Sequence, residues 1–412
     1  MALHVARSCF LLRRRSSGAP WTLNVVMLTR ERVRELASAS GLSVARVTSA
    51  DPFEGLADKL EAHIGAGRMA GLNWFTVERA RFSTDPRNLH PTGRSIIAVG
   101  LPYWQPTVQP PDDGEPRGRI SRYAWGRDYH KTLKDRMRDL KSRLESEMSQ
   151  SIEARLLVDT ARIVDRAAAA RSGLGWYGKN AMILVPGHGS WVMLGELVVD
   201  IAIELDPPLK PRCGQCTGCL DACPTGALVA PYTVDTPSCI SFLTIELVGP
   251  VPRGLRSQMC DWVFGCDVCQ EVCPYTGAAR AADDEAFRPA RIENAFPSLH
   301  WLLRMTEPEF REVYRGTAVL RTKRAGLARN AAIALGNAGS SRDLAVLEEA
   351  LITHDEPLVR GHAAWAMAHI DQSAASATLL RQLVREEDAF VRAEIAEALT
   401  LLSEEPTYSN FQ

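Results

Sequence analysis

The run Cys213-Gly-Gln-Cys-Thr-Gly-Cys-Leu-Asp-Ala-Cys-Pro224 is the most informative stretch of this 412-residue chain. Its four cysteines are separated by two, two and three residues, and a proline follows the last of them. Two-residue gaps let three neighbouring thiolates converge on the irons of one cubane, and the proline turns the chain away. The run therefore predicts an iron–sulfur segment around these residues.

A second half-motif follows in the sequence Cys266-x2-Cys269-x3-Cys273-Pro274. Val263 stands where this motif should begin with a cysteine. In two-cluster ferredoxins the fourth cysteine of such a run ligates the other cluster. One further ligand must come from elsewhere, and either Cys239 or Cys260 supplies it.

The cysteines therefore divide into two sets of four, which predicts two 4Fe-4S clusters. The first set is Cys213, Cys216, Cys219 and Cys273. The second is Cys223, Cys266 and Cys269, with Cys239 or Cys260 as its fourth member.

Zinc is the alternative for this segment, but four-cysteine zinc sites favour C-x2-C pairs that lie far apart. Nine of the ten cysteines lie between Cys213 and Cys273, whereas a disulfide scaffold is usually a small chain with cysteines throughout. The distribution favours metal binding in a reducing compartment.

Charge and hydropathy exclude several classes of protein. Lys and Arg number 48 against 49 Asp and Glu, for a net charge of −1, which excludes a globally basic nucleic-acid binder but not a local basic patch. No apolar run approaches the roughly 18 residues of a membrane span, so we expect no membrane association. Residues 1–30 hold five arginines and no acid, and we interpret 1–28 as a disordered or targeting extension.

Residues 29–205 mix helix and strand signals, which predicts a layered α/β domain. Thr29 is positioned to cap a first helix that runs to Ser40, and 129–148 reads as a long charged helix. A helix over 161–171 separates two of the expected strands. The expected strands are 95–101, 154–158, 181–185 and 191–203.

The C-terminal part of the chain repeats itself. Arg329, Arg360 and Arg392 begin matching Ala-rich amphipathic blocks, and each block is preceded by another helical segment. This pattern is typical of a short solenoid of HEAT type over 325–405. The preceding segment 288–324 holds eight Lys and Arg against four Glu, and we interpret it as basic linker helices.

The block from Val158 to Asn180 reads VDTARIVDRAAAARSGLGWYGKN, and GSWVMLGE follows at 189–196. Together with the two cysteine motifs and the repeats, this resembles the epoxyqueuosine reductase family over about residues 29–400. The resemblance implies an α/β (α+β) cobalamin-binding domain at 29–205, a ferredoxin-like segment with two 4Fe-4S clusters at 206–287, and C-terminal α-helical HEAT-like repeats. It also implies that an epoxide on a modified wobble base of tRNA is reduced to an alkene.

The resemblance places the proton donor for the leaving oxygen at Asp159. A solvated Asp has a pKa near 3.9, and we expect burial beside an apolar corrin face to raise it. The alternative is that Asp159 caps a helix that starts at Ala161. For Asp165, inside that helix, we expect a surface ion pair with Arg166 or Arg162.

The resemblance also favours Cys239 over Cys260 and implies a set of corrin contacts. No D-x-H-x-x-G motif is present, so we expect no histidine ligand to cobalt and interpret His130 as a helix-start residue. Arg122 belongs to a segment that resembles the family's substrate-side loop, with a plain exposed loop as the alternative. The expected cofactor contacts are Arg122, Asp159, Asn180, Ile183, Leu194 and, more weakly, Ser241.

The expected partners are a tRNA carrying epoxyqueuosine and an unidentified electron donor, and we expect a cytoplasmic monomer. The basic segment 288–324 and the repeat arginines are candidate phosphate contacts, although 325–403 holds six arginines and eleven acids. A solvated charged face is the alternative. Two rival functions remain: a reductive dehalogenase, and an electron-transfer scaffold without cobalt.

Overall fold

The computed structural model describes residues 27–106 and 108–400, and the extension expected at 1–28 lies almost wholly outside them. A four-stranded sheet organises the first part of the chain, in the order β1-β2-β7-β4. Every neighbouring pair in it is antiparallel. Its strands are β1 (Val44–Ser49), β2 (Ser95–Pro102), β7 (Val192–Val199) and β4 (Ala154–Leu157).

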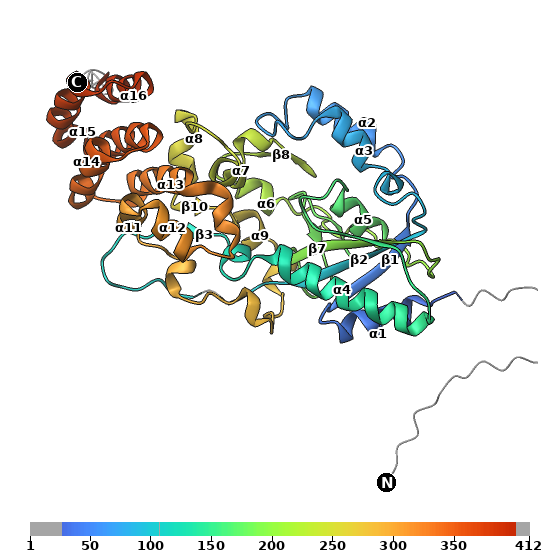
Figure 1. Cartoon of the computed structure of the whole chain (residues 1–412). Helices are drawn as coiled ribbons and strands as arrows, with labels where there is room; N and C mark the ends of the chain where they lie inside the picture. The colour runs from blue at the N-terminus through green and yellow to red at the C-terminus, as the bar shows by residue number, and fades with distance from the viewer. Residues whose placement is uncertain (1–26, 107, 401–412) are drawn as a thin grey trace, which may run out of the picture.

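Helices cover both faces of this sheet (Figure 1). On one face, α1 (Arg30–Ala39) and α4 (Tyr129–Met148) pack on the sheet through an apolar core. On the other face, α5 (Asp165–Arg171) packs against β7 and β2. The surrounding short elements are α2 (Leu56–Gly65), α3 (Val77–Ser83), β5 (Trp176–Tyr177) and β6 (Ile183–Leu184).

Several expected elements are confirmed and others are wrong. The Thr29 hydroxyl accepts a hydrogen bond from the Arg32 N–H at 3.2 Å and caps α1 as predicted, and α4 has the predicted bounds. The expected layered arrangement of mixed α and β structure is confirmed, and the antiparallel sheet makes the domain α+β. Helix α5 begins at Asp165 rather than at residue 161, and β1 was not predicted.

The cysteine segment consists of short helices and strands. Strand β10 (Trp262–Phe264) pairs in parallel with β3 (Arg119–Ile120), so the cysteine segment takes a strand partner from the first part of the chain. The remaining elements are α6 (Gly218–Asp221), β8 (Leu228–Ala230), β9 (Thr233–Val234), α7 (Ile240–Ile245), α8 (Arg253–Arg256), α9 (Val268–Glu271) and α10 (Pro274–Gly277).

Antiparallel helices form the C-terminal part, which lies at the opposite end of the molecule from α1 (Figure 1). One apolar core runs from the cysteine segment into these helices, so the two regions are packed together. No helix among residues 27–106 and 108–400 is long and apolar enough to cross a membrane. The helices are α11 (Leu299–Arg304), α12 (Glu307–Val313), α13 (Lys323–Ala338), α14 (Leu344–Thr353), α15 (Pro357–Arg385, kinked at Asp371) and α16 (Ala389–Thr400).

Candidate functional site

The first predicted set of cysteines surrounds one cavity. Cys213, Cys216, Cys219 and Cys273 line a space of about 180 Å³, together with Lys179 and Asn180 of the first domain. Lys179 Nζ donates to the Gly214 carbonyl at 2.7 Å and fastens the turn before β6 to the cysteine loop. The four cysteines therefore line one shared space beside the first domain.

The second set is more deeply buried. Burial raises the pKa of the thiols of Cys239, Cys266 and Cys269, and the neighbouring thiols, including that of Cys223, raise it further. Because thiols in such surroundings ionise only when a cation compensates the charge, this donor set fits an iron–sulfur cluster. The structure thus brings Cys239 together with the other three.

Cys260 lies apart from both sets. The residue is exposed, although partial burial of its thiol raises the pKa. The charged neighbours that also affect this pKa are Asp261 and Arg119, and no other cysteine is among them. Its backbone φ is +52°, at the end of a short 3-10 helix. The alternative that Cys260 completes the second set therefore finds no support in the fold.

The arrangement does not resemble a site for a single metal ion. Within the described ranges, no three His, Cys, Asp or Glu side chains converge closely enough to hold one ion. Thiolates that bind a cubane stand at its separate corners, whereas the four ligands of zinc converge on one point. The geometry favours clusters over zinc.

Asp159 follows β4 and collects hydrogen-bond donors from two distant segments. Its Oδ2 accepts a hydrogen bond from the Tyr129 hydroxyl at 2.7 Å, and His130 Nε2 lies 3.3 Å from the same oxygen. Arg321 Nη1 lies 3.7 Å away. The backbone of Asp159 has φ +44°, a conformation that Asp tolerates better than most residues and that is frequent at functional sites.

The expected rise in the pKa of Asp159 depends on an adjacent corrin face, and the protein's own side chains act in the opposite direction. Burial acts to raise the pKa, but the hydrogen bonds from His130 and Tyr129 and the charge of Arg321 outweigh it, so the net shift is downward. Sequence reasoning missed these donors because they come from α4 and from the segment before α13. Asp159 is therefore ionised at neutral pH.

His130 holds the proton that Asp159 lacks. Its Nδ1 lies 2.8 Å from Asp128 Oδ1 while its Nε2 faces Asp159. The hydrogen bonds to Asp128 and Asp159 raise the pKa of His130 to about 9 against the opposing effect of burial. The interpretation of His130 as only a helix-start residue is incomplete, because its imidazole Nε2 lies 3.3 Å from the carboxylate of the candidate acid.

The two alternatives for the acidic residues of this loop are wrong. Val164, and not Asp159, occupies the N-cap of α5. Asp165 is not in a surface ion pair, because its Oδ1 is buried and has no hydrogen-bond partner among the described residues. Burial raises its pKa, and the charge of Asp159 raises it further.

Four of the expected corrin contacts lie near the cysteines or on one apolar face. Asn180 Nδ2 donates to the Cys269 carbonyl at 3.3 Å, and the backbone and hydroxyl of Ser241 donate to the Cys239 thiol. Ile183 and Leu194 belong to one apolar group on the α5 face of the sheet. These side chains connect the second cysteine set with the sheet.

Arg122 is not in an exposed loop. It is 7% exposed, and its Nη1 lies 2.5 Å from Glu271 Oε1 and 3.4 Å from Asp267 Oδ2, both in the cysteine segment. Its guanidinium also lies near the rings of Trp125 and Trp191. The arginine joins the first domain to the cysteine segment.

One edge of β7 fits a large amide-bearing ligand. Strand β4 pairs with Glu196–Val199 and leaves Val192–Gly195 without a strand partner on that side. Met193 and Leu194 are partly exposed there, and Asp159 follows the end of β4. The residues here thus offer an unpaired strand segment, partly exposed apolar side chains and a half-exposed carboxylate, which are groups able to contact a large ring with amide side chains.

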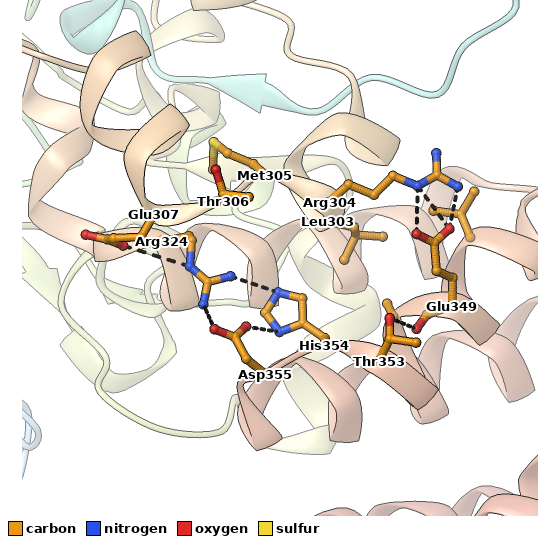
Figure 2. Close-up of a pocket in the computed structure, with 12 residues that line it drawn as sticks. Leu303, Arg304, Met305, Thr306, Glu307, Arg324, Glu349, Thr353, His354 and Asp355 are labelled. Carbon is orange, nitrogen blue, oxygen red and sulfur yellow. Dashed lines mark hydrogen bonds and ion pairs between the residues drawn. The ribbon is translucent and has the colours of Figure 1, made fainter.

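A separate pocket of about 360 Å³ lies among α11, α12, α13 and α14 (Figure 2). Its arginines face its own carboxylates: Arg304 Nη2 lies 2.6 Å from Glu349 Oε2, and Arg324 Nη2 lies 2.5 Å from Asp355 Oδ2. The pocket is therefore no cationic anion site. Several of the positive charges in the basic segment 288–324 are neutralised in this way by ion pairs within the protein.

The repeat arginines are also used internally. Arg329 is fully buried, and its guanidinium donates to the carbonyls of Leu243, Leu247 and Gly249. Arg360 pairs with Glu386 at 2.8 Å. The expectation that these arginines contact phosphates is wrong for Arg329, which supports the cysteine segment instead.

The paired cysteine sets beside an α+β domain and helical repeats define an iron–sulfur oxidoreductase. The family model "Epoxyqueuosine reductase QueG, DUF1730" matches residues 84–160. A "4Fe-4S double cluster binding domain" matches 212–276, and "HEAT repeats" match 317–400.

Relatives of high coverage carry the same name. Epoxyqueuosine reductase of Xanthomonas campestris is 35% identical over 340 residues, covering 82% of this chain and 95% of the relative. That of Bacillus subtilis is 35% identical over 382 residues, covering 92% and 97%. A crystal structure of epoxyqueuosine reductase with an epoxyqueuosine-modified tRNA-Tyr stem loop is 34% identical, with a TM-score of 0.84 over 91% of this chain and 98% of that one. The chain belongs to the epoxyqueuosine reductase family.

Proposed function

We propose that the chain reduces epoxyqueuosine to queuosine at the wobble position of tRNA. The family membership supports the reaction, and the solved relative bound to a modified stem loop supports tRNA as the substrate. Removing the epoxide oxygen as water consumes two electrons and two protons and leaves an alkene. The observation on which the proposal depends is the grouping of two cysteine sets beside a half-exposed, hydrogen-bonded Asp159. The fold offers no reason to prefer a dehalogenase or a plain electron carrier.

We assign the cofactors to adjoining regions of the chain. Two 4Fe-4S clusters would be held within 206–287, the first by Cys213, Cys216, Cys219 and Cys273, the second by Cys223, Cys239, Cys266 and Cys269. Cobalamin would lie against the open edge of β7 in 29–205, with Leu194, Ile183, Asn180 and Ser241 around it and Arg122 bracing the junction behind. When bound, the clusters would supply electrons one at a time, and the cobalamin would supply a redox-active cobalt centre.

The protein's own contribution to the chemistry is proton delivery. The leaving oxygen develops negative charge, and a positioned acid lowers the barrier for its departure. Asp159 faces the open side of the site and is the proton donor in this proposal. Because its carboxylate is ionised, one of the two protons comes from His130, with Asp159 passing it from Nε2 to the substrate oxygen, and the other comes from solvent. Asp128 holds the imidazolium in place from the other side.

For tRNA binding we propose a surface that is patchy in charge. Arg291, Arg315 and Lys323 of the basic segment are exposed, whereas several of its other cations are paired with neighbouring acids. Phosphate contacts from a few exposed cations would give a modest dependence on salt. Shape complementarity to the anticodon stem would contribute the rest.

The decisive experiment is an assay for loss of the epoxide on isolated tRNA, with anaerobically purified holoenzyme, added cobalamin and a reductant. Wild type should convert the base, and Asp159→Ala should abolish conversion while retaining iron and cobalt. Asp139→Ala, at an exposed position on α4, is the matched control and should behave as wild type. Normal turnover by Asp159→Ala would remove this residue from the mechanism, and an inactive wild type with full cofactor content would refute the function.

A further inference from the structure

Behind Asp159, a carboxyl group lies in the apolar interior of the sheet. Glu196 sits on central strand β7, between Ala98 of β2 and Leu157 of β4 in the strand register. It is 0% exposed, and neither of its carboxyl oxygens has a hydrogen-bond donor among the described residues. A buried carboxylate without a donor is strongly unfavourable, so this group requires a proton.

The side chain that faces Glu196 is a second acid. Asp165, the first residue of α5, interacts with Glu196, and its Oδ1 is buried without a donor in the same way. Two buried carboxylates near each other repel, so ionisation of one raises the pKa of the other. A single shared proton removes the repulsion and gives each residue the hydrogen-bond partner that it otherwise lacks.

The charges around the pair point to the same state. Burial raises the pKa of both carboxyls, and the charge of Asp165 raises that of Glu196 further. Asp159 raises the pKa of Asp165, while Arg166, whose guanidinium donates to the Ala181 carbonyl, opposes this rise. The opposing cation is weaker than burial and Asp159 together, so the pair keeps its proton at moderate pH.

The pair stands at one end of the loop that bears Asp159. This loop runs from the end of β4 at Leu157 to the start of α5 at Asp165. Its other end continues directly from β4, and Asp159 holds a left-handed backbone conformation in between. A bond between Asp165 and Glu196 therefore ties the far end of the loop to the middle of the sheet.

We propose that Asp165 and Glu196 form a proton-sharing acid pair that positions the Asp159 loop and releases it when the proton is lost. The inference rests on the role proposed above for Asp159. Both acids are positioning residues in this proposal, because they act through the Asp159 loop: Glu196 is buried on β7, and Asp165 begins α5. Their isosteric amides should keep the tie without being able to ionise.

Tryptic cleavage after Arg162 tests the tie without any need for turnover. Arg162 is exposed within the loop, so its cleavage reports on how freely the loop opens. The cleavage rate of wild-type holoenzyme is divided by that of Glu196→Gln at the same pH. This ratio should rise several-fold from mildly acidic to alkaline pH. Glu35→Gln, at an exposed position on α1, is the matched control and should follow wild type.

Single-turnover rates on epoxyqueuosine tRNA provide the second readout. Wild type should show a first decline near neutrality from the acid pair and a second near pH 9 from His130. Glu196→Gln should remove only the first decline, and Asp165→Asn should reproduce this result from the other side of the pair. The proposal is overturned if both amide variants keep the wild-type pH dependence in cleavage and in rate. If wild type turns over no epoxide at all, the proposed function fails, and the cleavage assay still decides the inference.

Discussion

Arg321 Nη1 lies 3.7 Å from Asp159 Oδ2, although the two residues are 162 positions apart in the sequence. The Nε of the same guanidinium lies 2.7 Å from Glu246 Oε1. Burial acts to lower the pKa of Arg321, but Glu246 and Asp159 raise it overall, so the cation persists. The segment before α13 thus supplies a positive charge to the candidate acid, directly beside the helical repeats.

Arg321→Gln should raise the KM for tRNA and lower the rate. The side chain is 39% exposed, so it can meet a phosphate while it orients Asp159. Loss of one partly exposed charge contact corresponds to about 1 kcal/mol, or roughly fivefold. The measurement is kcat and KM on epoxyqueuosine tRNA at two salt concentrations. Arg311→Gln removes an exposed cation paired with Glu307 at 2.6 Å, and an equal effect there would contradict the special role of Arg321.

His130→Gln should lower the single-turnover rate by about 100-fold, the usual contribution of a positioned proton source. In wild type the rate should fall as the pH rises through about 9, because the imidazolium then loses its proton. The matching stability term is present in full below the unfolded value near 6.5 and disappears over the same rise. A pH–rate profile of the holoenzyme measures the fall in rate, and unfolding of the same protein across this pH range measures the stability term.

His369→Gln is the control for this prediction, since His369 is exposed on α15. It should leave the profile unchanged. A His130→Gln enzyme with the wild-type rate and profile would show that the proton reaches Asp159 by another path.

Local spacing explains why the cysteine sets could be predicted. The ligands of each run are neighbours in sequence, so their positions fix the cluster before the chain folds. Cys239 and Cys260 could not be separated on spacing alone, because only the tertiary fold brings Cys239 beside Cys266. Cysteines that belong to a recognisable run could thus be assigned, including the one that each run gives to the other cluster, and the isolated ligand could not.

The surroundings of Asp159 show the opposite case. Its partners Tyr129, His130 and Arg321 come from α4 and from the segment before α13, and no sequence period links them. Glu196 lies within the predicted strand 191–203, but the sequence does not show that its side chain is buried. The burial follows from the position of this residue on a central strand, between β2 and β4. Alternating helices and strands also do not fix strand direction, so the sequence predicts mixed α and β structure but not the antiparallel pairing.

Cys239→Ser should lower the iron content while Cys260→Ser leaves it unchanged. Wild type should contain roughly eight irons per chain, and loss of the second cluster should leave about four. Cys260 is the control because it is exposed and lies apart from both sets. Iron analysis and electron paramagnetic resonance of the reduced protein measure the result. Iron loss in Cys260→Ser, with full content in Cys239→Ser, would reverse the assignment.

Arg329→Met should destabilise the protein and leave the tRNA affinity of the folded fraction unchanged. The guanidinium is fully buried, and it donates to the Leu243 carbonyl at 2.6 Å and to the Gly249 carbonyl at 2.7 Å. Removing it strands several buried carbonyls, each at about 1–3 kcal/mol, so a loss of about 3 kcal/mol in unfolding free energy is expected. Arg342→Met, at an exposed position before α14, should cost far less. Thermal unfolding and filter binding of tRNA separate the effect on stability from the effect on affinity. A stable Arg329→Met protein with weakened tRNA binding would mean that this arginine contacts phosphate. Its burial beneath the cysteine segment argues against that outcome.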